Sequence, residues 1–190
     1  MAASDESSSY PPQAPGGLQW PGSAELEERL EEEIGRAERH GTHLACLLVV
    51  VDNLAGSTED GVAGELREQT LAYIAGALQR ELRRFDRVGM PSESEVLIVL
   101  PGADGPRGEM VARRVLERLR AIKVEARGQR RALRVSVGLA AWRAGVTPAM
   151  LLARARAAAE RSGNGEPPDR TGAGAPATGP APPEPPGVPS

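Results

Sequence analysis

The chain has 190 residues, with 23 basic and 26 acidic side chains and a net charge of −3. This balance gives no general attraction to nucleic acid or to anionic lipid, so neither is an expected partner. No run reaches the roughly 18–20 apolar residues of a membrane span, and the N-terminus lacks the apolar core of a signal peptide. The lone Cys46 lies in an apolar run, which predicts a buried, inert thiol. We therefore expect a soluble cytoplasmic protein.

Both ends of the chain differ in composition from its middle. Residues 1–22 are rich in Ser, Pro and Gly, and residues 165–190 hold 9 of the 17 prolines. Such segments bury too little apolar surface to offset the entropy lost on ordering. We predict a disordered N-terminal segment over residues 1–22, one folded domain over 23–164, and a disordered Pro/Gly/Ala-rich tail over 165–190.

Apolar periodicity predicts the elements of the folded part. In chain order they are a helix over 23–40, a strand over 44–51, a helix over 65–84, strands over 87–90 and 96–100, a helix over 105–122, a strand over 133–140 and a helix over 147–163. Ser23 is the predicted N-cap of the first helix, and Thr147 that of the last, with Pro148 following. Phe85 is expected to extend the apolar face of the second helix. The continuous apolar run over 44–51 implies cover on both faces of that strand.

This order of elements predicts the fold class. Within α-β-α-β-β-α-β-α lies the series β-α-β-β-α-β, which is the split ferredoxin-like arrangement. We therefore predict an α+β fold, with an antiparallel sheet and helices packed mainly on one face.

Four segments resemble the GGDEF family of diguanylate cyclases, which is similar to adenylyl cyclases and polymerase palm domains. They are LEEEIGRAERHGTHLACLLVVVDNL, LAYIAGALQRELRRFDRVG, VLIVLPGAD and ALRVSVGLAAW, in the family's order and spacing. The resemblance covers about residues 18–164. It implies the nucleotidyl-cyclase palm fold and a link to cyclic di-GMP signalling.

The family's signature turn is altered in this chain. Counting without gaps from residue 86 to residue 101, the Gly-Gly-Asp/Glu-Glu-Phe motif falls on Ser92, Glu93, Ser94, Glu95 and Val96. In the family the glycines let the backbone approach the nucleotide phosphates, the third position is a carboxylate that binds Mg²⁺, and the fourth is an acid at the same centre. Glu93 would place negative charge near the phosphates, and Ser94 is a poor ligand for a hard cation. We expect a relic turn with no catalytic residues.

The family's second metal position is altered as well. Its Asp-x-Asp-x-Phe-Lys motif falls on residues 50–55, which places Val50 at the metal ligand and Ala55 at the lysine. Sliding the alignment by two residues puts Asp52 at the ligand position, but this breaks the match over 36–44. The residual acids are then Asp52 and Glu95. We expect no cofactor, with Mg²⁺ required only if residual activity exists.

The positions that read guanine and phosphate also depart from the family. Thr58 and Glu59 replace its Asn-Asp pair, and the later Gly-Asp falls near Arg67 and Glu68. The last helix has no lysine to contact phosphate.

One family constellation is retained. Arg83 and Asp86 match the Arg-x-x-Asp that binds cyclic di-GMP as an inhibitor in active members, at the family's spacing from the turn. An arginine can fork onto a phosphate or a guanine edge, and a carboxylate can accept from guanine N–H groups. The alternative is structural: arginines favour a helix C-terminus, and Asp86 closes the turn that follows.

These observations predict a catalytically inactive GGDEF-like domain that acts as a regulatory or protein-interaction module in bacterial cyclic-dinucleotide signalling. Two alternatives stay open: a weak diguanylate cyclase that uses Asp52 and Glu95, and a cyclic di-GMP receptor that uses Arg83 and Asp86. The expected partners are an unidentified protein, cyclic di-GMP, or a second copy in a homodimer.

Overall fold

The computed structural model describes residues 20–52, 62–126 and 129–163. The predictions for both chain ends, and for Ala55, Thr58 and Glu59, lie outside these ranges. In chain order the elements are α1 (Ser23–His40), β1 (Leu44–Val51), α2 (Val62–Glu81), β2 (Arg87–Ser92), β3 (Glu95–Pro101), α3 (Gly105–Arg120), β4 (Lys123–Ala126), β5 (Gln129–Ala132), β6 (Val135–Ala141) and α4 (Pro148–Gly163).

The main sheet has four strands in the order β2-β3-β1-β6, and every neighbouring pair is antiparallel. Because β1 and β3 occupy its centre, both are almost entirely buried. The predicted α+β fold with an antiparallel sheet is confirmed, and the strand order is that of the ferredoxin-like arrangement.

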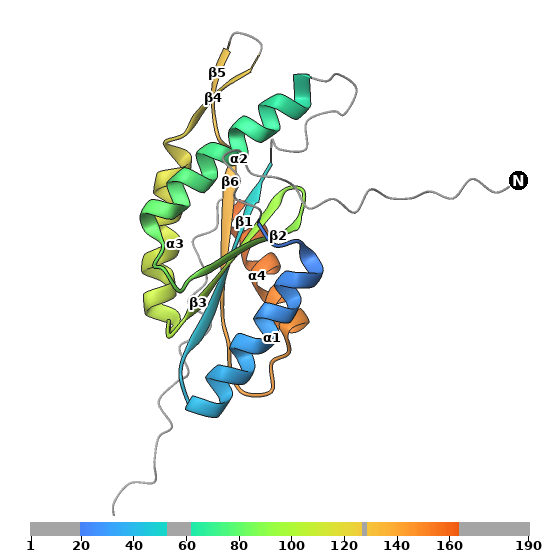
Figure 1. Cartoon of the computed structure of the whole chain (residues 1–190). Helices are drawn as coiled ribbons and strands as arrows, with labels where there is room; N and C mark the ends of the chain where they lie inside the picture. Colours follow the sequence, from blue (N-terminus) through green and yellow to red (C-terminus); the bar gives the residue numbers. More distant parts are fainter. Residues whose placement is uncertain (1–19, 53–61, 127–128, 164–190) are drawn as a thin grey trace, which may run out of the picture.

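Helices cover both faces of the sheet, so the prediction that they lie mainly on one face is wrong. Alternate residues of β1 contribute to two separate cores, because successive side chains of a strand point to opposite faces. Leu47 and Val49 pack with residues of α2 and α3, whereas Cys46 and Leu48 pack with residues of α1 and α4. Figure 1 shows α1 and α4 on one side of the sheet and α2 and α3 on the other. The flanking helices α1 and α4 supply the second layer.

Several local predictions need correction. A second, two-stranded sheet of β4 and β5 was not predicted, because its sequence KVEARGQRRA contains only one large apolar residue, Val124. The α2 helix ends at Glu81 rather than at residue 84, and Phe85 is 55% exposed instead of lying on the apolar face. At α1 the N-cap is Gly22, with no side-chain cap, so Ser23 is the first helical residue. The Thr147 cap is confirmed, since its hydroxyl accepts from the Met150 N–H at 3.3 Å.

α4 packs unusually closely against β6 at Gly138. A Cβ at Gly138 would lie 2.0 Å from the Ala155 carbonyl oxygen and 2.3 Å from the Ala159 nitrogen. Only a residue without a side chain therefore fits beneath this helix. The contact fixes the height of α4 above the sheet, and with it the reach of the α4 side chains.

Candidate functional site

The hairpin between β2 and β3 forms the tip at which the sequence analysis places the signature turn. Ser92 pairs with Glu95, so the turn itself consists of Glu93 and Ser94. The Ser94 carbonyl accepts from the Val51 N–H at 2.9 Å, which ties the turn to the end of β1.

Three residues form a row across the neighbouring strands. Val50 of β1 pairs with Glu95 of β3 on one side and with Ser136 of β6 on the other. Directly opposed residues of antiparallel strands share a face of the sheet. This row lies on the face that α4 covers, because Val50 packs against the core to which α4 contributes.

The Glu95 carboxylate is bound by an arginine of α4. Arg156 donates from Nε to Oε1 and from Nη2 to Oε2, each at 2.7 Å, and the Ser92 hydroxyl donates to Oε2 at 3.0 Å. The Glu95 side chain is 11% exposed. Hydrogen bonding by Arg156 lowers the pKa of Glu95, against the opposing effect of burial, and the Ser92 hydroxyl lowers it further. Glu95 is therefore held as a carboxylate whose two oxygens are already engaged.

Arg156 was missed by the sequence analysis, although a weak signal was present. The buried positions of α4 are Leu151, Ala155 and Ala159, spaced four residues apart. Arg156 lies at the margin of this buried stripe, where a long side chain can reach over the sheet. Periodicity alone does not identify its partner, which is 61 residues away in the sequence.

The second residual acid has a different arginine partner. Asp52 is exposed just beyond β1, with its Oδ2 4.0 Å from Arg134 Nε. Val50, at the position that the alignment assigns to the metal ligand, offers no oxygen ligand from its side chain. Within the described ranges, no three His, Cys, Asp or Glu side chains gather as a metal site would require.

The exposed side of the turn is contacted from α2. Arg67 Nη2 donates to the Glu93 carbonyl at 3.2 Å, and Nη1 lies 3.5 Å from Glu93 Oε2. The Glu93 side chain is 82% exposed, whereas that of Arg67 is 25% exposed. The buried Arg67 Nε has no acceptor among the described residues. The β2–β3 hairpin is thus contacted by arginines from helices on opposite faces of the sheet, Arg67 of α2 at Glu93 and Arg156 of α4 at Glu95.

The Arg-x-x-Asp residues lie in the short connection between α2 and β2. The Asp86 carboxylate accepts from the Arg83 backbone N–H at 2.7 Å, and the Arg83 side chain is exposed. Burial raises the pKa of Asp86, while the Arg83 hydrogen bond and charge act in the opposite direction. Glu81 forms ion pairs with Arg118 at 2.8 Å and with Arg114 at 3.8 Å, which brings two α3 arginines to the end of α2.

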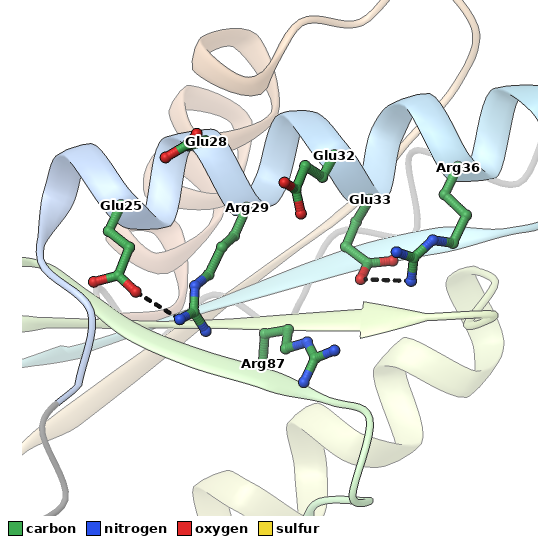
Figure 2. Close-up of a pocket in the computed structure, with 7 residues that line it drawn as sticks. All are labelled: Glu25, Glu28, Arg29, Glu32, Glu33, Arg36 and Arg87. Atoms are coloured by element: carbon green, nitrogen blue, oxygen red, sulfur yellow. Dashed lines mark hydrogen bonds and ion pairs between the residues drawn. The ribbon is translucent and has the colours of Figure 1, made fainter.

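A polar pocket lies elsewhere, along α1. Figure 2 shows its lining residues, Glu25, Glu28, Arg29, Glu32, Glu33, Arg36 and Arg87. Ion pairs join Glu25 to Arg29 and Glu33 to Arg36. Within the acidic run over 25–33, Glu33 is only 6% exposed, so it does not belong to the solvated face of α1. The pocket contains none of the predicted site residues.

The sequence profile described as "Diguanylate cyclase, GGDEF domain" matches residues 21–166. The chain belongs to the GGDEF family. This match confirms the resemblance seen in the sequence. Among the helices of the described residues, none is long and apolar enough to cross a membrane.

Three GGDEF relatives illustrate the similarity. The diguanylate cyclase DgcP of Pseudomonas aeruginosa is 34% identical over 103 residues, which is 53% of this chain and 14% of that protein. The structure of SiaD from P. aeruginosa, a diguanylate cyclase in complex with its activator SiaC, matches with a TM-score of 0.68 and 29% identity, over 77% of this chain and 56% of that one. A sensory box/GGDEF family protein from Caulobacter crescentus CB15 matches with a TM-score of 0.66 and 26% identity, over 81% and 99% of the two chains. The chain thus spans about a seventh of the curated relative.

Proposed function

We propose that this GGDEF domain is catalytically inactive and acts as a regulatory or protein-interaction module in bacterial cyclic di-GMP signalling. The observation that carries the proposal is the Arg156–Glu95 pair. Glu95, the one acid of the family motif that the alignment retains in the signature turn, has both oxygens bound to a guanidinium group at 2.7 Å. A divalent cation would have to displace a well-aligned, charge-assisted pair to reach them.

The other positions of the family's metal centre do not supply carboxylates in place of Glu95. Phosphoryl transfer of this kind relies on divalent cations to neutralise the triphosphate and to activate the attacking hydroxyl. Val50 and Ser94 stand where the alignment places two carboxylates. Losing one preorganised charge typically costs about 10²–10³ in rate, so two such losses and a sequestered Glu95 leave little catalysis. The activator complex of SiaD supports the part of the proposal that concerns a protein partner.

The proposal is tested by incubating the purified chain with GTP and either Mg²⁺ or Mn²⁺. We expect no cyclic di-GMP above the level of a protein-free blank, measured by chromatography, because no cation is held at the turn. An active GGDEF domain serves as the positive control. Turnover well above the blank that disappears in Glu95→Gln would support the rival reading, a weak cyclase that uses Asp52 and Glu95.

Restoring the two carboxylates is not expected to restore activity. A Val50→Asp/Ser94→Asp variant still carries the Arg156–Glu95 pair, and Glu93 still occupies a position at which family members have glycine. We expect the same assay to show no product. Robust synthesis by this double variant would show that the missing carboxylates alone account for the inactivity.

A second candidate function is a cyclic di-GMP receptor at Arg83 and Asp86. The observation that favours it is the pairing of Glu81 with Arg114 and Arg118, which places further guanidinium groups near the end of α2. Guanidinium groups can bind the phosphates or guanine edges of such a ligand, and the Asp86 carboxylate can accept from guanine N–H groups.

Calorimetry with cyclic di-GMP tests this second candidate. Under it we expect micromolar binding that Arg83→Ala weakens at least tenfold, because the phosphate or guanine contact of the guanidinium is lost. Arg39→Ala, on the exposed end of α1, is the matched control and should bind as the unaltered chain does. If titration of the unaltered chain with cyclic di-GMP gives no heat of binding, the receptor function is ruled out and the inactive regulatory module remains as the proposal.

A further inference from the structure

The two edges of the main sheet differ in how they are protected against pairing with another strand. β2, at one edge, contains Pro91, which has no N–H to offer, and its register with β3 shifts within the strand. Its Met90 N–H already donates to the Pro21 carbonyl at 3.0 Å. β6, at the other edge, has the sequence VSVGLAA and pairs with β1 in unbroken register. Proline, charge and register shifts commonly protect an edge strand, and β6 has none of them.

The backbone of β6 is open on the side away from β1. The Trp142 N–H donates to the Leu44 carbonyl at 2.8 Å, and the Arg134 carbonyl accepts from the Asp52 N–H at 3.0 Å. Because backbone groups alternate in direction along an antiparallel strand, even-numbered residues of β6 face β1 and odd-numbered residues face outward. The outward residues are Val135, Val137, Leu139 and Ala141. Among the described residues, their outward N–H and C=O groups have no hydrogen-bond partner.

Arginines of α4 lie beside this open edge. α4 packs over β6 and β1, and Arg156 extends inward across β1 to Glu95 of β3. Arg154 is rotated from Arg156 by about 200° around the helix, so it lies on the opposite side, toward the outer edge of β6. Arg161, about two turns further along, lies on the same side as Arg154. Both are exposed, and neither forms an ion pair with a described residue.

The α3 side of the edge adds no net charge. Arg114 and Arg118 of α3 point to Glu81 of α2. The opposite side of α3, toward β6, carries Arg120 and Glu109, whose charges cancel. The charge at the open edge is therefore positive, and it comes from α4.

We propose that the outer edge of β6 binds an extended acidic segment of a partner protein as an added antiparallel strand. Main-chain hydrogen bonds to the outward groups of β6 hold such a strand, and its carboxylates on the α4 face pair with Arg154 and Arg161. A second copy of this chain suits the edge less well. Antiparallel pairing of two β6 edges would bring two sets of these arginines together on one face of the joined sheet.

This inference rests on the protein-interaction part of the proposed function and gives it a surface. It does not depend on catalytic inactivity, because neither Glu95 nor the Arg83–Asp86 pair belongs to the edge. A binding experiment without nucleotide therefore tests it separately from the assay for cyclic di-GMP synthesis.

The test is a nuclear magnetic resonance titration of the full chain, at low salt, with a synthetic peptide of seven residues, the length of β6, that alternates glutamate and valine. We expect binding that slows amide hydrogen exchange of Val137, Leu139 and Ala141 by about tenfold or more, because these N–H groups gain acceptors. Exchange at Gly138, which faces β1, should change much less. A peptide with glutamine in place of glutamate should bind about tenfold more weakly.

Methylated peptides test the strand geometry. Val135 and Val137 point to the α2–α3 core, and directly opposed residues of antiparallel strands share a face. With the glutamates on the α4 face, the valines therefore bond to β6. Methylation of the valine nitrogens should abolish binding, whereas methylation of the glutamate nitrogens should leave it nearly unchanged.

Variants of the chain test the charge. Arg154→Gln/Arg161→Gln should weaken binding of the glutamate peptide about tenfold. Arg39→Gln/Arg80→Gln, an equal change in charge at exposed positions of α1 and α2, should not. Thermal unfolding checks that each variant is folded. The proposal is overturned if the glutamate peptide does not bind, if valine methylation leaves binding intact, or if the outward amides already exchange slowly without peptide, which would show that the chain itself or a second copy covers the edge.

Discussion

Gly138→Ala is expected to lower the free energy of unfolding by roughly 3 kcal/mol or more, at the upper end of what overpacking costs. A Cβ at this position would lie 2.0 Å from a carbonyl oxygen of α4, and a backbone atom cannot move aside as the end of a flexible side chain can. The helix must shift as a whole. Urea denaturation of the variant and of the unaltered chain measures the change.

Gly76→Ala is the matched control for this prediction. Gly76 lies within α2, and a Cβ there meets nothing within 4 Å. Because alanine is favoured over glycine in a helix, this variant should be unchanged or more stable by up to about 1 kcal/mol. A loss of less than about 1 kcal/mol in Gly138→Ala would show that α4 is not held at the height described here.

Arg156→Met is expected to lower the free energy of unfolding at pH 7 by about 2 kcal/mol. Removing one partner of a buried ion pair typically costs about 3–5 kcal/mol, because the other charge is left without compensation. The lower figure applies because the Arg156 side chain is 43% exposed and water screens the pair. Arg154→Met, at an exposed position of the same helix, should change stability by less than about 0.5 kcal/mol.

The effect of Arg156→Met should depend on pH in a defined direction. Hydrogen bonding by Arg156 lowers the pKa of Glu95 in the folded state below its ordinary value in the unfolded chain. The pair therefore stabilises the fold fully above that unfolded value, and the stabilisation is lost as the pH falls through the folded pKa. Denaturation at pH 7 and at successively lower pH should show the difference between the two proteins shrinking in acid. A difference that stays constant would mean that Arg156 acts through packing rather than through the Glu95 charge.

The strands of the main sheet could be predicted from the sequence because they carry strong local signals. The run over 44–51 predicted a strand covered on both faces, and the two cores on either side of β1 confirm this. The same apolar run indicates that helices lie on both faces of the sheet. The prediction of helices mainly on one face came instead from the β-α-β-β-α-β series. The β4–β5 hairpin was missed because its two short strands carry a single large apolar residue, Val124, which is too little for a periodic pattern.

Less of the candidate functional site than of the fold could be predicted from the sequence. Alignment assigned roles to Val50, Ser94 and Glu95, and these roles stay predictions. Periodicity does not reveal that Arg156 binds Glu95 or that Arg67 contacts Glu93, because each pair joins residues that are distant in sequence. Such contacts depend on how α2 and α4 are placed over the sheet, and for α4 this placement includes the close approach to Gly138.

The most direct test of the central claim is the number of divalent cations bound in the presence of GTP. Electron paramagnetic resonance of Mn²⁺ titrated into the purified chain with a non-hydrolysable GTP analogue measures free and bound cation, with Glu95→Gln as the matched control. We predict that the two proteins leave identical amounts of Mn²⁺ free, because Arg156 already occupies the remaining carboxylate. One or two tightly bound cations per chain that are lost in Glu95→Gln would contradict this account.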